Sequence, residues 1–398
     1  MRCEAEFLYL GGRAQLRPAD RARMEALLGA DGFDWEDALG LAAFHGVLPL
    51  LGSNLAVLEG VPASILERVR EWMKENATAN LLKFSELIRI DRLFAEQGVS
   101  TVHFKGPVLA AHAFRNLALR KFFDIDVLIH ESDARKARAL LLANGYSSTL
   151  SPEGEELHLR TSYWLGFVHD TSPNKVDLHW KLADPFFRYE PDLPTLWANV
   201  QTLQLAGAEI RTFGPEDSVL VLAAHGFKHG YSRLKWVCDL CEWIRVHPEL
   251  DWDSIVAAAR SLHVHRILSV SLLLVHELDD EVLPAGLAAQ CAVDAKAVAL
   301  KQRVWERIFD GRGALEGWRG EWFHAKGRER TGDAIHYLWH QCVRRFKKVF
   351  VPNEKDRAMV RLPTGLGFLY YALRPFRLGW KVVSRKRSRT ESPDAGSD

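Results

Sequence analysis

The chain has 398 residues, of which 47% are hydrophobic and 26% are charged, proportions typical of a soluble globular protein. This length exceeds the usual size of one domain, so two or three subdomains are expected. The formal net charge of +1 argues against a protein that coats DNA or RNA, although not against a local basic groove. No apolar run reaches the ~20 residues of a membrane span.

The cysteines and the N-terminus indicate a cytoplasmic protein. The five cysteines are few and scattered, as is usual in a reducing compartment. The first residues lack a basic start followed by a long apolar stretch, so no secretory signal is expected.

Residues 1–98 are predicted to form a helical N-terminal cap. Apolar residues recur at helical spacing in segments 36–51 and 63–97. His45, in the first of these segments, is most simply a core or interface histidine. We expect this cap to pack on the sheet that follows.

Residues 99–214 are predicted to form an αβ core that begins with a strand, a turn and a helix. Residues 100–104 favour a strand, and Pro107 suits the first position of a helix. Lys105 and Gly106 form the turn, where free backbone N–H groups and the lysine charge would favour a phosphate. The alternative is an ordinary strand-to-helix turn.

The segment 123–129 alternates between acidic and apolar residues. On a strand, Asp124 and Asp126 would share one face and lie ~6.6 Å apart along the backbone. Aspartate is uncommon in strands, and neighbouring carboxylates repel unless a cation lies between them. The pair therefore predicts a site for Mg²⁺ or Mn²⁺, held together with substrate phosphates. The alternative is an edge strand whose polar face meets water.

A third acid, Asp177, lies in a predicted hairpin of residues 164–169 and 175–180. If this hairpin extends the same sheet, Asp177 would join Asp124 and Asp126, and the three carboxylates could hold two metal ions ~3.5–4 Å apart. Asp177 could also accept a proton from the attacking group. The alternative is a solvent-facing strand residue.

Residues 215–300 are predicted to form a helical domain rich in basic side chains. Lys228 and Lys235 would face the nucleotide or its acceptor, while apolar residues of the same segment pack inward. His225 and His229 are four residues apart and would share a helix face, yet no nearby glutamate completes a zinc-protease motif.

Residues 301–383 are predicted to form a mostly helical extension, and the polar residues 384–398 a disordered tail. Segment 332–350 is expected to be a helix with a basic end. Segment 365–383 is aromatic and then basic, so it could lie on a membrane surface or contact a partner. The alternative is a helix packed on the body of the protein.

Several of these motifs together resemble a known family. They occur in the order FKG, Arg120, FDIDVLI, Gly145–Tyr146 and VDLHW. This pattern resembles the uncharacterised bacterial nucleotidyltransferase family of the DNA polymerase β superfamily. The lysine–glycine turn and Asp-x-Asp are also similar to nucleotidyltransferase toxins of the abortive-infection type. Gly106 is followed by proline, where the commoner form of the superfamily has serine.

The resemblance implies a fold and a set of site residues. The fold would be α+β: a polymerase β-like nucleotidyltransferase core, with a mixed sheet and flanking helices, between helical N-terminal and C-terminal regions. The catalytic and metal-binding residues would be Asp124, Asp126 and Asp177. The residues that bind the NTP would be Lys105, Gly106, Arg120, Lys228 and Lys235. The alternative for Arg120 is a solvated loop charge.

The sequence therefore predicts an enzyme that transfers a nucleoside monophosphate from an NTP to an unknown acceptor and releases pyrophosphate. The acceptor could be a small molecule, an RNA or a protein. Two alternatives remain: a kinase-like phosphoryl transferase, and a non-catalytic module that binds an NTP or a partner.

Overall fold

The computed structural model describes residues 2–29, 32–183, 189, 191–309, 317–351, 369–371, 374, 375 and 377. The chain divides into two compact units, residues 1–334 and 335–398. The predicted boundaries after residues 98, 214, 300 and 383 remain predictions.

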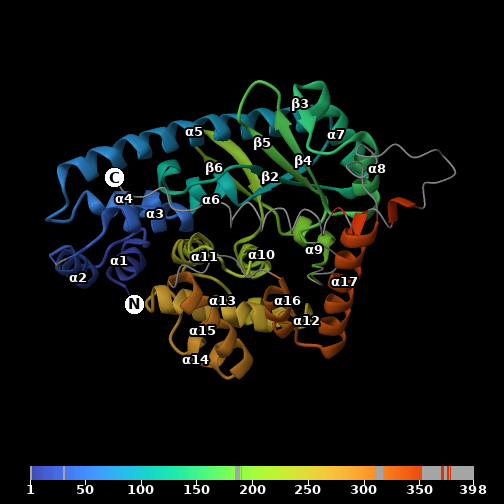
Figure 1. The fold of residues 1–398 in the computed structure, drawn as a ribbon. Coiled ribbons are helices and arrows are strands. Elements are labelled where there is room, and N and C mark those ends of the chain that lie inside the picture. The colour runs from blue at the N-terminus through green and yellow to red at the C-terminus, as the bar shows by residue number, and fades with distance from the viewer. Residues whose placement is uncertain are drawn as a thin grey trace, which may run out of the picture. The chain divides into compact units, whose positions relative to one another are not determined.

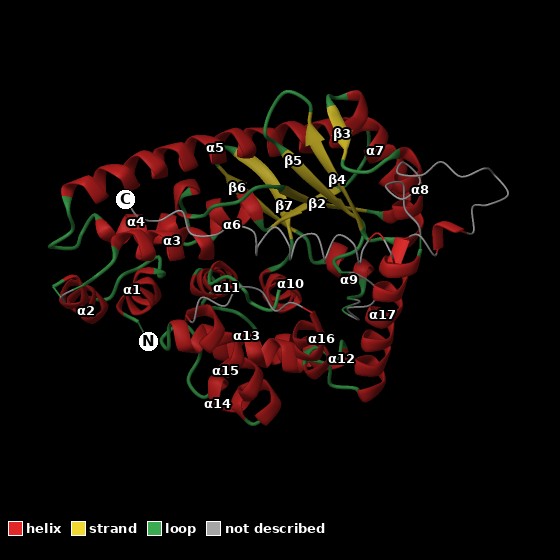
Figure 2. Cartoon of the chain, viewed as in Figure 1, coloured by secondary structure: helices red, strands yellow, loops and turns green. Residues whose placement is uncertain are grey.

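The first unit contains a five-stranded mixed sheet in the order β1-β2-β5-β4-β3 (Figure 2). The strands are β1 (Thr101–Phe104), β2 (Ile125–Ile129), β3 (Tyr146–Ser148), β4 (Trp164–His169) and β5 (Lys175–His179). Strands β2 and β5 run parallel, and the other neighbours are antiparallel. The predicted hairpin is therefore confirmed as β4 and β5, and it extends the sheet that contains the aspartate strand.

One face of this sheet packs on the long helix α5 (Ala63–Glu96), which runs along the sheet in Figure 1, and on α7 (Ala134–Ala143). Side chains alternate along a strand, so Val127 of β2 and Val176 of β5 point toward this face. They belong to one buried cluster with Leu87 and Ile90 of α5. The acidic positions of β2 and β5 consequently point to the opposite face.

The opposite face lies against helix α10 (Pro215–Lys228). Phe104 of β1 and Leu128 of β2 share a buried cluster with Phe213 and Val221. Beside β1 lies a separate two-stranded sheet formed by β6 (Gln201–Leu205) and β7 (Ala208–Thr212).

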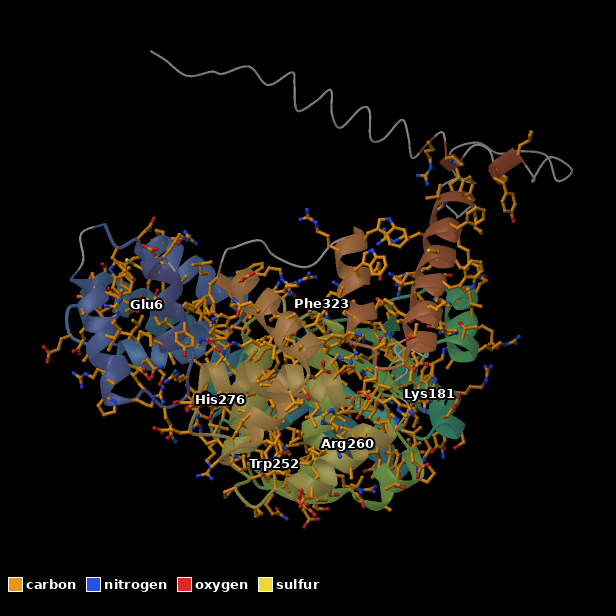
Figure 3. The ribbon with its side chains drawn as sticks, turned by 90° about the horizontal axis from the view of Figure 1, so that it is seen from below. Glu6, Lys181, Trp252, Arg260, His276 and Phe323 are labelled. Carbon is orange, nitrogen blue, oxygen red and sulfur yellow. The ribbon has the colours of Figure 1, made fainter. Side chains whose placement is uncertain are left out.

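Beyond α10 follows a layer of helices: α11 (Lys235–Arg245), α12 (Trp252–Ser261), α13 (His265–Leu278), α14 (Leu287–Ala292), α15 (Ala295–Phe309) and α16 (Gly317–Lys326). Figure 3 shows this layer from below, with Arg260 of α12 and His276 of α13 at its exposed surface.

The N-terminal helices are α1 (Cys3–Gly11), α2 (Pro18–Leu28), α3 (Trp35–His45) and α4 (Leu48–Leu55). The expectation that the whole N-terminal segment packs on the sheet is wrong, because α1–α4 share their core with α10–α15 and only α5 packs on the sheet. Segment 36–51 is also two helices. They are separated at Gly46, whose φ of 71° ends α3. His45 is a buried core residue as predicted, and its Nδ1 accepts the Leu234 N–H.

Shorter elements connect these layers: α6 (Gly106–His112), η1 (Leu117–Leu119), η2 (Glu131–Asp133), α8 (Pro152–Thr161) and α9 (Leu193–Ala198). Helix α17 (Thr331–Phe350) crosses the boundary at residue 334 and makes up most of the described part of the second unit. Segment 365–383 lies mostly, and segment 384–398 wholly, outside the described residues. Among the helices that the structure describes, none combines the length and apolar character that a membrane crossing requires.

Candidate active site

The Lys105–Gly106 turn joins β1 to α6 in an unusual backbone conformation. Lys105 has φ 61° and ψ −142°, values that are costly for a residue with a side chain. Gly106 has φ 27°, and a Cβ added there would lie 3.0 Å from the backbone oxygen of Asp124. The turn is therefore strained and packed directly against the residue that precedes β2.

Asp126 and Asp177 lie opposite each other in the register of the parallel strands β2 and β5. His179 lies two residues after Asp177 and so faces the same side of the sheet. One ligand atom from each of these three side chains lies within 4.8 Å of the others. The structure thus brings together the two acids that the sequence placed on separate strands.

His179 is the site residue to which the sequence reasoning gave no role. Its Nε2 lies 3.1 Å from Oδ1 of Asp126, and its side chain is buried. The alternation in VDLHW already placed His179 on the same face as Asp177. This shared strand face could have indicated that His179 belongs to the site.

Asp124 lies at the edge of this group. In the described residues, the cluster that could hold a metal consists of Asp126, Asp177 and His179, without Asp124. Asp124 is nevertheless close enough for its charge to act on both other acids. Burial and the charge of Asp126 raise the pKa of Asp124, and Asp124 helps to raise the pKa of Asp177.

The two central acids differ in charge state because their neighbours differ. Lys105 Nζ donates to Asp126 Oδ1 at 2.6 Å. Burial opposes ionisation of Asp126, but Lys105 and His179 outweigh it and hold the pKa of Asp126 below its ordinary value. Burial and the charges of Asp126 and Asp124 raise the pKa of Asp177 to about 7. One carboxylate is therefore firmly ionised, and the other exchanges a proton near neutral pH.

Arg120 contacts the Lys105–Gly106 turn through a buried hydrogen bond. Its guanidinium donates to both carboxylate oxygens of Asp239 on α11, at 2.6 and 2.8 Å, and to the Gly106 carbonyl at 3.3 Å. Arg120 and Asp239 are 6% and 3% exposed. A phosphate contact was expected from the sequence, whereas the contacts seen here hold Gly106 in place.

Lys228 and Lys235 lie near the acids but make different contacts. Lys228 Nζ donates to the Tyr163 hydroxyl at 2.7 Å. Its charge lowers the pKa of Asp177, whereas the charge of Lys235 lowers that of Asp124. Burial and the neighbouring Arg120 lower the pKa of Lys235 to about 8.

The predicted histidine pair adds no metal ligands to the site. The rings of His225 and His229 lie 4.7 Å apart, and His229 stacks on Trp236. Burial lowers the pKa of both rings, so they are neutral at pH 7. Among the described residues, neither histidine joins a group able to hold a metal.

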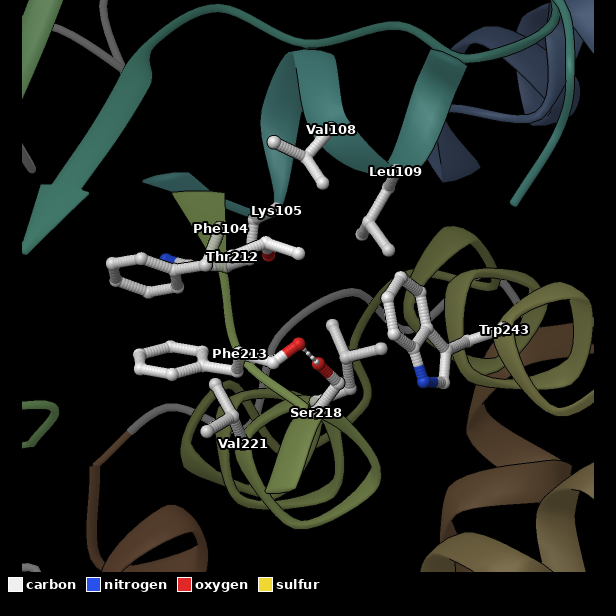
Figure 4. A pocket seen from close by; sticks show the side chains of 10 residues that line it. Phe104, Lys105, Val108, Leu109, Thr212, Phe213, Ser218, Val221 and Trp243 are labelled. Atoms are coloured by element: carbon white, nitrogen blue, oxygen red, sulfur yellow. Dashed lines mark hydrogen bonds between the residues drawn. The ribbon is translucent and has the colours of Figure 1, made fainter. Parts of the chain in front are cut away.

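Two cavities meet at Phe104 and Lys105. The first also contains Tyr189, His225 and Lys228, so it places two lysines beside aromatic and apolar walls. The second has mainly apolar walls, including Phe213 and Trp243, and Ser218 donates to the Phe213 carbonyl within it (Figure 4). The first cavity is chemically suited to a ligand with both phosphate and ring groups.

The fold and the site together define a class of protein. A mixed α+β fold whose sheet presents carboxylates from two adjacent strands beside a lysine-bearing turn is consistent with a nucleotidyltransferase. The comparison with protein families agrees. The model of a family described as "Uncharacterised nucleotidyltransferase" matches residues 31–279, well over half of the chain, and the chain belongs to this family. No curated protein matches the sequence.

Proposed function

We propose that the protein is a metal-dependent nucleotidyltransferase of the polymerase β-like type. It transfers a nucleoside monophosphate from an NTP to an acceptor and releases pyrophosphate. The observation that carries this proposal is the pair Asp126 and Asp177, which face each other across β2 and β5 while Lys105 contacts Asp126. Family membership supports the reaction class.

The residues present fit a divalent metal ion. Burial of the three carboxylates, together with their mutual repulsion, raises the pKa values of Asp124 and Asp177. Oxygen ligands of this kind suit Mg²⁺ or Mn²⁺. Asp126 and Asp177 would hold the ion, with Asp124 as a further ligand, and His179 would orient Asp126 through the contact at 3.1 Å. The bound ion would neutralise phosphate charge as the reaction proceeds.

The chain's own residues have separate roles in this proposal. Lys105, Lys228 and Lys235 supply positive charge for the triphosphate. The acceptor's attacking atom forms a bond to the α-phosphorus, the bond from that phosphorus to the β-phosphate bridging oxygen breaks, and pyrophosphate leaves. Asp177, whose carboxylate lies beside Asp126 in the site, takes the acceptor's proton.

A labelling experiment tests the reaction class. The protein is incubated with Mg²⁺, a cell extract as the source of acceptor, and each of the four NTPs labelled in turn on the α- or the γ-phosphate. The proposal expects the α-label in the acceptor. Transfer of the γ-label would instead show a kinase, and binding of NTP without any transfer would show a non-catalytic module.

Variants of the site residues test whether the proposed active site carries out the transfer of the α-label. Asp126→Asn and Asp177→Asn are each expected to reduce transfer of the α-label at least about 10³-fold, because each removes a metal ligand. Asp253→Asn is the matched control, since Asp253 is an exposed residue of α12 and its loss should leave transfer unchanged. Unchanged transfer in the two site variants would contradict the proposal.

A further inference from the structure

Helix α17 exposes a continuous apolar stripe. We define this stripe as Ile335, Trp339, Cys342, Phe346, Val349 and Phe350. These residues recur every three or four positions and therefore lie on one face of the helix. Every member is exposed, and Ile335, Trp339 and Phe346 are exposed by 63%, 68% and 61%.

The opposite face of the helix is buried. Tyr337 and Gln341 lie on the far side from the stripe and are each 6% exposed. The buried and the exposed side chains thus lie on different faces of this part of the helix. Folded monomers rarely expose contiguous apolar surface of this kind, and where they do it marks an interaction site.

The charge around the stripe is positive. Lys347 is exposed next to the stripe, and residues 334–353 contain no Asp or Glu. After Glu354 and Asp356, residues 357–390 again lack acids and include the run RKRSR at 385–389. The complementary partner therefore carries negative charge next to apolar groups.

A bilayer with anionic headgroups has both properties. An amphipathic helix with basic residues and exposed Trp and Phe lies in the plane of such an interface, where its aromatic side chains enter the acyl boundary. Nucleic acid would satisfy the charge but would leave the stripe in water. An acidic protein would need an apolar groove of matching length.

We propose that α17 binds the surface of an anionic lipid bilayer, with the stripe inserted at the headgroup level and Lys347 contacting lipid phosphates. This surface is independent of the proposed chemistry, and it lies outside the region that the family model matches. In this proposal the helix lies in the plane of the membrane surface.

Vesicle flotation of the full chain tests the proposal. The protein should float with vesicles of phosphatidylcholine and phosphatidylglycerol, and much less with phosphatidylcholine alone. Raising the salt concentration should weaken binding, because the lipid attraction is partly electrostatic. The double variant Trp339→Glu, Phe346→Glu should reduce the bound fraction at least about tenfold. Lys347→Gln should weaken binding only to the anionic vesicles.

A matched variant controls for added charge and for lost apolar surface. Leu157→Glu with Val293→Glu introduces the same two charges at exposed apolar positions, on α8 and after α14. It should float like the wild type, and all variants should show the wild-type thermal melt.

Some outcomes would overturn the proposal. Wild-type protein that stays with the unbound fraction, or a double variant that floats equally well, would exclude a lipid role for the stripe. A wild-type dimer that Trp339→Glu with Phe346→Glu dissociates, without vesicle binding, would assign the stripe to a second copy. Binding of an RNA oligonucleotide in place of vesicles would assign the basic surface to nucleic acid.

Discussion

At the scale of single residues, the site depends on an imbalance between two neighbouring acids. Asp126 has Lys105 and His179 in contact, so its charge is stabilised. Asp177 is largely buried and lies close to Asp126 and Asp124, so its pKa rises to about 7. The folded protein without metal therefore pays a free-energy cost for ionising Asp177, which a bound cation would remove.

Asp177→Asn is expected to stabilise the metal-free protein at pH 8. The folded pKa lies above the unfolded value, so the stability that Asp177 contributes is present at acid pH and is lost as the pH rises through about 7. Removing this carboxylate should raise the Tm in EDTA by about 2 °C or more at pH 8, and change it little at pH 4. Thermal melts at the two pH values measure this difference.

Asp126→Asn is the contrasting variant. The folded pKa of Asp126 lies below its ordinary value, so its charge contributes stability at neutral pH. Its replacement leaves Lys105 without this carboxylate and should lower the Tm at pH 8. A fall in Tm for Asp177→Asn under the same conditions would contradict the expected cost of ionising Asp177 in the folded protein.

Arg120 and Asp239 are expected to act on the reaction through the turn that they support. Arg120→Lys keeps the positive charge but cannot make the two-oxygen contact with Asp239 and the Gly106 contact together. It should reduce kcat/KM for nucleotidyl transfer by about 10–100-fold. Asp239→Asn should also destabilise the fold by about 3 kcal/mol, because it weakens a buried ion pair.

Hydrogen exchange separates a local effect of Arg120→Lys from global unfolding. Amides of residues 104–112 should exchange faster in the variant, while those of β4 keep the wild-type rate. If activity falls although exchange in 104–112 is unchanged, Arg120 would act directly on the substrate, as the sequence first indicated.

At the scale of elements, the β1–α6 turn joins the residues proposed to bind phosphate to those proposed to bind the metal. Its φ angles are positive at Lys105 and Gly106, and it lies against the backbone of Asp124. Strain of this kind persists only where surrounding contacts hold it. Here those contacts come from Arg120 and from the ion pair of Lys105 with Asp126.

Gly106→Ala is expected to reduce nucleotide affinity and stability together. The new Cβ would press on the Asp124 oxygen at 3.0 Å and displace the start of β2. A loss of stability of about 2 kcal/mol and a clear rise in Kd for the NTP are expected. Chemical denaturation and calorimetric titration measure the two effects.

Gly98→Ala is the control variant, because it introduces backbone strain without a new side-chain contact. Gly98 has a φ of 67°, yet an added Cβ meets no atom within 4 Å. It should lose about 1 kcal/mol of stability from backbone strain and keep the wild-type Kd. An equal change in Kd for both variants would show that packing against Asp124 is not what matters.

At the scale of the whole molecule, buried neutral histidines make the fold sensitive to acid. Burial lowers the pKa of His45 and His112 to about 4, and that of His229 and His324 to about 3. The unfolded chain protonates these residues near pH 6.5. As the pH falls from 6.5 toward 4, proton uptake therefore favours the unfolded state.

The Tm is expected to fall steeply between pH 7 and pH 5. Each such histidine contributes up to about 1.4 kcal/mol per pH unit within this window, and together they outweigh the opposite effect of Asp177. His112→Gln should make the dependence on pH shallower, because glutamine keeps a polar partner for His247 without titrating. A Tm that is constant over this range would contradict the argument.

The sequence by itself determined the local elements and the identity of the acids. Alternation in FDIDVLI and VDLHW fixes which residues share a strand face, so Asp126 and Asp177 could be named, and with them the class of chemistry. Pairing of strands more than forty residues apart is not encoded locally, so only the tertiary structure decided that β2 and β5 are neighbours. The same reason explains Arg120, whose partner Asp239 is 119 residues away on α11, so its contacts with Asp239 and with the turn could not be predicted. It also explains His179, whose proposed role depends on its contact with Asp126 on the neighbouring strand. The N-terminal helices follow the same rule, because their apolar faces pack on α10–α15, the layer that offers the larger core.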